Sequence, residues 1–195
     1  MSVLGLDLSL TSTGYVVLAS SGTVLDHGTV GYGLKKPKVA DHQKRLADIA
    51  EKVEDVLSDA SPQYVVMEDY AFNKFSKTQS ITGLAELTGV VKYTLHQWRH
   101  EPIIVTASHA RKVVVGKSPG TTAADRKKKI TVKDKLAVMV KEQYSLTFPT
   151  DDEMDAFVLA EAIRKLAKGG PLDPSVIAAL RKTTKRRKGA KKSGK

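Results

Sequence analysis

The sequence contains no cysteine and no long apolar run, and these two absences narrow the possible classes of protein. Without cysteine the chain can form no disulfide, no thiolate zinc site and no thiol nucleophile, which is compatible with a reducing cytoplasm. No apolar stretch approaches the roughly 20 residues that a membrane helix needs. The first apolar stretch contains an acid and lacks a basic leader, so it is a poor signal peptide. We therefore expect a cytoplasmic location and no membrane partner.

Acidic residues are absent from the last 15 residues, which hold nine Lys or Arg. The formal net charge is +11, so the other 180 residues carry only +2. Within them, residues 111–135 hold nine Lys or Arg against two Asp, which leaves the rest of the chain net acidic. Two basic zones beside an acidic body suit a polyanionic partner such as a nucleic acid. The alternative is a solvated surface followed by a disordered tail.

The length of 195 residues suits one domain with a core, and we expect a domain over residues 1–170 and a basic, flexible tail over residues 171–195. Apolar runs predict strands at residues 2–7, 14–19, 23–31, 63–68 and 102–105. Helical spacing predicts helices at residues 39–58, 77–97, 131–144 and 150–168, with a short helical stretch at 174–180. Residues 116–129, which contain Gly, Pro and a Lys cluster, are predicted to form a mobile loop.

The order of these elements predicts an α/β fold with a mixed sheet. Residues 20–22, Ser-Ser-Gly, form a tight connection that favours a hairpin, so the first strands should pair antiparallel. The later strands alternate with helices, which favours parallel pairing.

Four carboxylates occupy positions where an unpaired charge would be unfavourable. Asp7 and Glu68 each lie at the end of an apolar run that is predicted to be a buried strand. Asp152 and Asp155 lie three residues apart on the last predicted helix. Converging oxygen ligands suit hard divalent cations, and metal-assisted cleavage of a phosphodiester is the most economical use of such a site.

The start of the last helix has a structural explanation for part of this cluster. Thr150 and Glu153 have the spacing of a capping box, and acids in general favour a helix N-terminus. Capping accounts less well for Asp152 and Asp155, because both lie on the stripe that carries the apolar residues from 156 onward. An acid on a core-facing stripe needs a partner, and a metal ion is one such partner.

Each strand-end acid also has an alternative explanation. Asp7 leads into a turn rich in Ser and Thr that could satisfy its carboxylate by hydrogen bonds. Glu68, beside Asp69, could be a water-exposed acid on an edge strand. We favour a shared site because all these separate explanations would otherwise have to hold at once. The five histidines are scattered without ligand spacing, and we interpret them as surface or core residues.

The ordered pattern resembles the RuvC-type Holliday junction resolvases of the retroviral-integrase/RNase H superfamily. The resemblance covers most of residues 2–166 and rests on the order and spacing of its pieces. These pieces are residues 4–15 around Asp7, residues 65–68 ending in Glu68, the helix with Gly83 and Gly89, residues 111–117, and residues 152–156 with Asp152 and Asp155. Compact chains of this kind also resemble versions carried by bacteriophages, for which the location would be the host cytoplasm.

This resemblance implies an RNase H-like five-stranded sheet in the order 3-2-1-4-5, with helices on both faces. It implies a metal-dependent endonuclease of DNA recombination and repair that resolves four-way junctions, and other branched DNA as a further substrate, by paired symmetric nicks. It also implies a homodimer, for which the helix at residues 77–97 is our candidate interface. The catalytic and metal-binding residues would be Asp7, Glu68, Asp152 and Asp155, with Mg²⁺ as the cofactor and Mn²⁺ as a substitute.

Two groups of residues are candidates for DNA contact. The first group is basic and comprises Arg111, Lys112, Lys117, Lys127, Lys128 and Lys133, whose alternative role is a solvated face. The second group is aromatic and comprises Tyr70, Phe72 and Phe75. The family often has an aromatic residue three positions after the Glu, where this chain has Ala71. The neighbouring aromatic residues could stack on unpaired bases in its place, or could fill the core.

Three other functions are compatible with the sequence. One is a related nuclease that acts on structured RNA, and another is a non-catalytic nucleic-acid-binding module with structural acids. The third is an actin-like ATPase, because a Gly-x-Asp followed by Ser and Thr is similar to a phosphate loop. That third fold requires two related halves, and the sequence shows no second copy.

Overall fold

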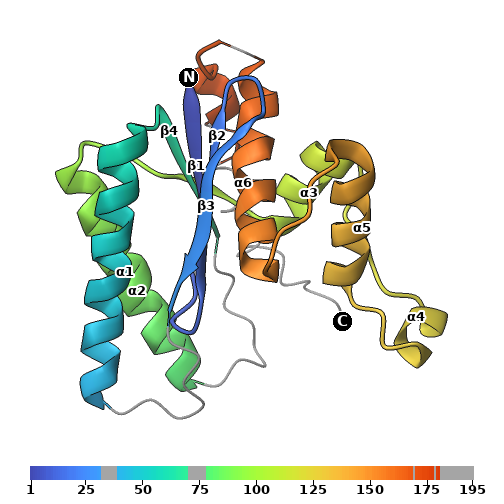
Figure 1. The fold of residues 1–195 in the computed structure, drawn as a ribbon, viewed down its shortest axis with the longest axis horizontal. Helices are drawn as coiled ribbons and strands as arrows, with labels where there is room; N and C mark the ends of the chain where they lie inside the picture. Colours follow the sequence, from blue (N-terminus) through green and yellow to red (C-terminus); the bar gives the residue numbers. More distant parts are fainter. Residues whose placement is uncertain (32–38, 70–77, 169, 178, 181–195) are drawn as a thin grey trace, which may run out of the picture.

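The computed structural model describes residues 1–31, 39–69, 78–168, 170–177 and 179–180 (Figure 1). Its strands are β1 (Ser2–Asp7), β2 (Thr13–Ala19), β3 (Val24–Val30), β4 (Tyr64–Glu68) and β5 (Ile103–Val105). Its helices are α1 (Val39–Ala60), α2 (Thr78–Gln97), α3 (Ala107–Val115), α4 (Ala123–Lys127), α5 (Val132–Tyr144) and α6 (Asp151–Ala167). No helix within these ranges is both long and apolar enough to cross a membrane.

The five strands form one mixed sheet in the order β3-β2-β1-β4-β5, which confirms the expected arrangement. β1 pairs antiparallel with β2, and β2 pairs antiparallel with β3. β1 pairs parallel with β4, and β4 pairs parallel with β5. β1 is therefore the central strand, and Glu68 is on an interior strand and not on an edge.

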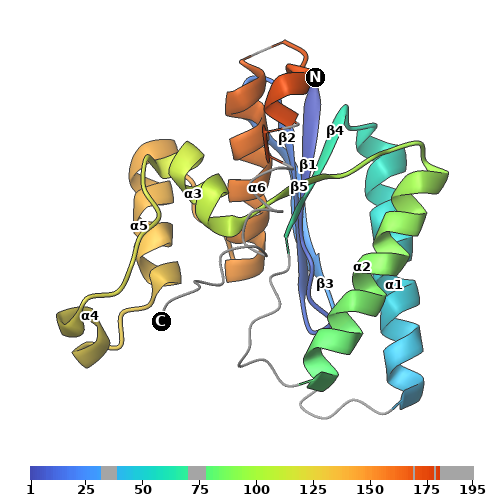
Figure 2. The same ribbon diagram turned by 180° about the vertical axis from the view of Figure 1, so that it is seen from behind.

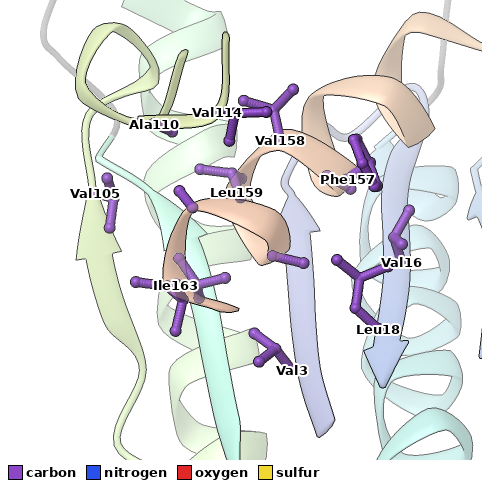
Figure 3. Packing of buried hydrophobic residues seen from close by; sticks show 14 of the residues in the cluster. Val3, Val16, Leu18, Val105, Ala110, Val114, Phe157, Val158, Leu159 and Ile163 are labelled. Carbon is purple, nitrogen blue, oxygen red and sulfur yellow. The ribbon is translucent and has the colours of Figure 1, made fainter. Parts of the chain in front are cut away.

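Helices cover both faces of the sheet (Figures 1 and 2). On one face, α1 and α2 pack on Leu4, Leu6 and other residues of the sheet. On the other face, α6 lies directly on the sheet, with α3 and α5 outside it. Figure 3 shows the second layer, in which side chains of α6 such as Leu159 and Ile163 fill the space beside Val3 of β1. Successive residues of β1 thus serve opposite layers, as the alternation of a strand requires.

The segment between β5 and α5 differs from the expectation. The sequence gave no indication of α3, and α4 lies within residues 116–129, which were predicted to be a loop. α4 buries no residue, so it has no apolar period to detect, and a capping box of Thr122 and Asp125 holds its start. α3 ends at Gly116, which has the left-handed conformation (φ 77°) that glycine adopts without strain.

The domain extends beyond residue 170, where we expected the tail to begin. Leu172 and Leu180 are buried in the same core layer as α6, and the Leu172 backbone N–H donates to the Tyr64 hydroxyl at 2.8 Å. Residues 174–177 and 179–180 are helical, in agreement with the predicted short stretch. The boundary between domain and tail therefore moves to about residue 180, because these apolar side chains are removed from water.

Candidate active site

The direction of the Asp7 and Glu68 side chains follows from strand alternation. Val3 and Gly5 of β1 face α6, so Asp7, two residues further on, lies on that same face. On β4, Val66 faces α6, and the same step of two places Glu68 there as well. β1 and β4 are parallel neighbours, so both acids lie at the same edge of the sheet.

Two glycines allow α6 to bring its own acids to this edge. A Cβ added at Gly14 would lie 2.2 Å from the Asp152 carbonyl oxygen, and one added at Gly5 would lie 2.1 Å from that of Ala156. Gly14 is the register partner of Asp7 on the adjacent strand. The helix backbone therefore lies against the sheet beside Asp7. We did not single out these two glycines as packing positions from the sequence, because their role depends on a helix about 140 residues away.

The start of α6 is capped as expected on one side only. The Thr150 hydroxyl accepts a hydrogen bond from the Glu153 N–H at 3.2 Å. The Glu153 side chain does not complete the predicted capping box, because its carboxylate lies 3.2 Å from Nδ1 of His27 on β3. Glu153 is only 5% exposed, and this contact gives its buried carboxylate a partner.

Asp155 is buried and is paired with two basic residues. Its Oδ1 accepts a hydrogen bond from an Arg111 terminal nitrogen at 3.1 Å, and the Lys133 ammonium lies 3.0 Å from its Oδ2. The same ammonium is 3.9 Å from Asp151 and 4.0 Å from Asp152. Arg111 and Lys133 are thus both at the carboxylate cluster, and α3 and α5 contribute one cation each.

The clustering of negative charge raises the pKa values of the two strand-end acids. Burial, then Asp155, Glu68 and Asp152, raise the pKa of Asp7 from 3.8 to about 7, although Lys133 opposes the shift. Burial and the neighbouring Asp155 also raise the pKa of Glu68. Burial lowers the pKa of the Lys133 ammonium, but Asp155, Asp151 and Asp152 outweigh it and raise that pKa above its usual value. A cation placed among these acids would relieve their mutual repulsion.

The donor set fits a hard divalent cation, since it consists of four carboxylates and no sulfur or imidazole. Within the described residues, no three His, Asp or Glu side chains already form a coordination group. Asp155 in particular is engaged by Arg111 and Lys133 instead. Binding of an ion therefore requires side-chain movement.

The remaining predicted DNA contacts are distributed differently. Lys112 on α3, Lys117 after it, and Lys127 and Lys128 at α4 are exposed. They belong to the part of the molecule that projects beside α6 in Figures 1 and 2. The predicted aromatic contacts Tyr70, Phe72 and Phe75, together with Ala71, lie outside the described residues.

Sequence reasoning also missed the polar contacts that fix the loop after Asp7. Thr13 is 1% exposed, and its hydroxyl donates to the Ser9 carbonyl at 2.7 Å and accepts from the Ser9 N–H at 3.1 Å. Arg45 of α1 is also buried and donates to the Leu10 carbonyl at 3.1 Å. The Ser and Thr residues there were a sign of a tight turn, but nothing in the sequence indicated the contact with Arg45.

A five-stranded sheet in this order, with acids at the ends of β1 and β4 and on α6, defines a nuclease of the RNase H-like class. The family profile of the crossover junction endodeoxyribonuclease RuvC matches residues 3–162. The crossover junction endodeoxyribonuclease RuvC of Dictyoglomus thermophilum is 32% identical over 162 residues, which cover 82% of this chain and 93% of the relative. The chain therefore belongs to the RuvC family and is a metal-dependent endodeoxyribonuclease that resolves Holliday junctions.

Solved structures have the same fold. T. thermophilus RuvC in complex with a Holliday junction substrate superposes with a TM-score of 0.66 at 19% identity, covering 87% of this chain and 96% of that one. A second structure of Thermus thermophilus RuvC gives a TM-score of 0.65 at 18% identity, covering 86% and 96%. The family match and the single sheet favour the DNA nuclease over the RNase, the non-catalytic module and the two-halved ATPase.

Proposed function

We propose that the protein cleaves four-way DNA junctions at a site formed by Asp7, Glu68, Asp152 and Asp155. The observation that carries this proposal is the convergence of acids from β1, β4 and α6 at one edge of the sheet, strong enough to raise the pKa of Asp7 to about 7. An excess of negative charge that the fold maintains at some cost in stability is typical of a functional site.

The chemistry requires a metal ion, for which Mg²⁺ is our assignment and Mn²⁺ a substitute. When bound, such ions activate a water molecule and offset the charge on the leaving oxygen of a phosphodiester. Asp7, on the central strand, is the residue best placed to share ions with both of its neighbours. Glu68 would act beside it from β4, and Asp152 and Asp155 would act from α6.

Basic residues would hold the DNA backbone near these acids. Arg111 and Lys133 already lie at the carboxylates, while Lys112, Lys117, Lys127 and Lys128 offer exposed positive charge for phosphate contacts. The residues from 181 onward would add affinity that is independent of DNA sequence and sensitive to salt. Tyr70, Phe72 and Phe75 remain candidates for stacking on unpaired bases at the branch point. A cytoplasmic location is consistent with the cysteine-free sequence.

A homodimer would place two such sites on one junction, as paired nicks require. We propose α2 as the interface because Tyr93 on it is 65% exposed, and a Cβ at Gly89 would meet no described atom within 4 Å. Gly83 has a different role from the one expected, since a Cβ there would lie 2.5 Å from the Leu10 side chain of the same chain. The open part of α2 is therefore its C-terminal half.

The direct test is cleavage of end-labelled four-way junction, fork and linear duplex DNA with Mg²⁺, beside the variant Asp7→Asn. We expect paired nicks in the junction and none in the variant. Equal cleavage of forks and flaps would extend the substrate to branched DNA in general. Junction binding without cleavage, with Mn²⁺ as well as Mg²⁺, would contradict the catalytic assignment.

A further inference from the structure

The ammonium group of Lys133 lies where the carboxylate cluster would attract a divalent ion. It is 3.0 Å from Oδ2 of Asp155 and within 4.0 Å of carboxylate oxygens of Asp151 and Asp152. One cation surrounded by three acids is the arrangement that a metal ion would also adopt, with shorter distances. Lys133 and the metal therefore seek the same oxygen atoms.

Asp155 cannot serve a metal fully while both of its oxygens are engaged. Arg111 binds Oδ1 and Lys133 lies at Oδ2. A divalent ion on either oxygen would lie close to one of these positive groups, which repel it. Loading of the site therefore requires at least one of the two basic side chains to move away.

Lys133 is the side chain that can move. Its side chain is 38% exposed, whereas that of Arg111 is 17% exposed. Lys133 is the second residue of α5, which lies outside α6, while α3 with Arg111 packs closely on α6. A lysine ammonium on a flexible stem is also more strongly hydrated than a guanidinium, so its transfer to water is favourable.

We propose that Lys133 is an exchangeable counter-ion of the active site. A divalent ion displaces its ammonium from Asp155, and the displaced ammonium is then free to bind a phosphate of the DNA. Before the metal arrives, Lys133 keeps the crowded acids together; after it arrives, the same charge serves the substrate. This inference rests on the proposed metal site and assigns to Lys133 a role in when that site fills.

Such an exchange makes metal binding and DNA binding mutually supportive. DNA that attracts the Lys133 ammonium leaves Asp155 more available to the ion, and an ion at Asp155 leaves Lys133 more available to DNA. By linkage, each ligand then raises the affinity of the other by the same factor.

The test is calorimetric titration of Mn²⁺ into the DNA-free protein, for the unaltered chain, Lys133→Met and Lys141→Met. Lys141→Met is the matched control, because it removes an exposed lysine from the same helix away from the acids. We expect Lys133→Met to bind Mn²⁺ on the order of tenfold more tightly and Lys141→Met to bind it as the unaltered chain does. Lys133→Arg, which keeps the charge, should not gain affinity.

The outcomes separate this inference from the proposed function. Equal or weaker Mn²⁺ binding by Lys133→Met, with binding intact in the unaltered chain, would overturn the exchange and leave the metal site standing. Failure of the unaltered chain to bind Mn²⁺ would overturn the metal site itself.

A second measurement needs no variant and therefore does not depend on whether Lys133→Met folds. Lysine acylation of the unaltered protein, read by mass spectrometry, should be several-fold faster at Lys133 with Mn²⁺ than without it. Acylation of Lys141 should not respond to the ion. An unchanged rate at Lys133 under conditions where Mn²⁺ is bound would contradict the displacement.

Discussion

The carboxyl group of Asp7 lies at the end of the central strand, where burial and three neighbouring acids all oppose its ionisation. The folded protein therefore holds a proton on Asp7 up to a pH of about 7, whereas the unfolded chain loses it near 3.8. Between these values folding takes up a proton. The contribution of Asp7 to stability is present at low pH and is lost as the pH rises through about 7.

Replacing Asp7 by Asn should stabilise the metal-free protein above about pH 7. The full shift corresponds to about 4 kcal/mol, but Asp7 is partly exposed, so we expect roughly 1–2 kcal/mol after allowing for solvent screening. Urea denaturation with chelator present at high and low pH measures this, and the gain should vanish below about pH 4. A variant that is less stable than the unaltered protein at neutral pH would contradict the assignment. Added Mn²⁺ should raise the melting temperature of the unaltered protein and not that of the variant.

The pair of His27 and Glu153 makes a separate prediction at the same scale. Removal of the imidazole by His27→Ala leaves the buried Glu153 carboxylate without its 3.2 Å partner and should cost about 1–3 kcal/mol. In a double-mutant cycle, His27→Ala should cost much less when Glu153→Leu is already present. Additive losses would mean that the two side chains do not interact. Chemical denaturation of the four proteins decides between these results.

At the scale of elements, the distance between α6 and the sheet determines whether the acids meet. Gly14 and Gly5 leave no room for a side chain, so the helix backbone contacts β1 and β2 directly. Each glycine reduces the separation of two layers, and the position of two of the four acids depends on that separation.

Gly14→Ala should therefore displace α6 and weaken both folding and cleavage. The added Cβ would lie 2.2 Å from the Asp152 carbonyl oxygen, and we expect a loss of about 3 kcal/mol or more. Gly120→Ala is the control, because a Cβ at Gly120 would meet no described atom within 4 Å. Melting temperature and junction cleavage should fall in the first variant and not in the second. A fully stable Gly14→Ala protein would show that the layers can separate at little cost.

The limits of sequence reasoning also appear among the elements. Strands β1 to β5 and helices α1, α2, α5 and α6 were predictable, since each has an apolar period or run matching its geometry. α4 was not, because it has no buried face, and the Glu153 side chain was assigned to its own helix when its partner lies on β3. The four site acids could be named from local patterns. The engagement of Asp155 by Arg111 and Lys133 could not, because it depends on how α3 and α5 pack against α6.

At the scale of the whole molecule, the proposed dimer depends on an exposed face of α2. Tyr93→Glu should weaken self-association without lowering the stability of the monomer, because Tyr93 is 65% exposed and buries little within its own chain. Sedimentation velocity over a range of protein concentrations measures the change. Leu25→Glu on β3 is the matched control, since Leu25 is 58% exposed and distant from α2 in the sheet order. If Leu25→Glu dissociated the dimer and Tyr93→Glu did not, the interface would lie at the β3 edge.

The four acids are divided between the two ends of the chain. Asp7 belongs to the first strand to leave the ribosome, whereas Asp155 belongs to the last helix of the domain. A polypeptide released before α6 is synthesised would carry the first two acids and the first basic residues but not the acids that complete the site. The nuclease can therefore acquire its cutting activity only at the end of its own synthesis, and prematurely terminated chains pose no danger to the DNA of the cell that makes them.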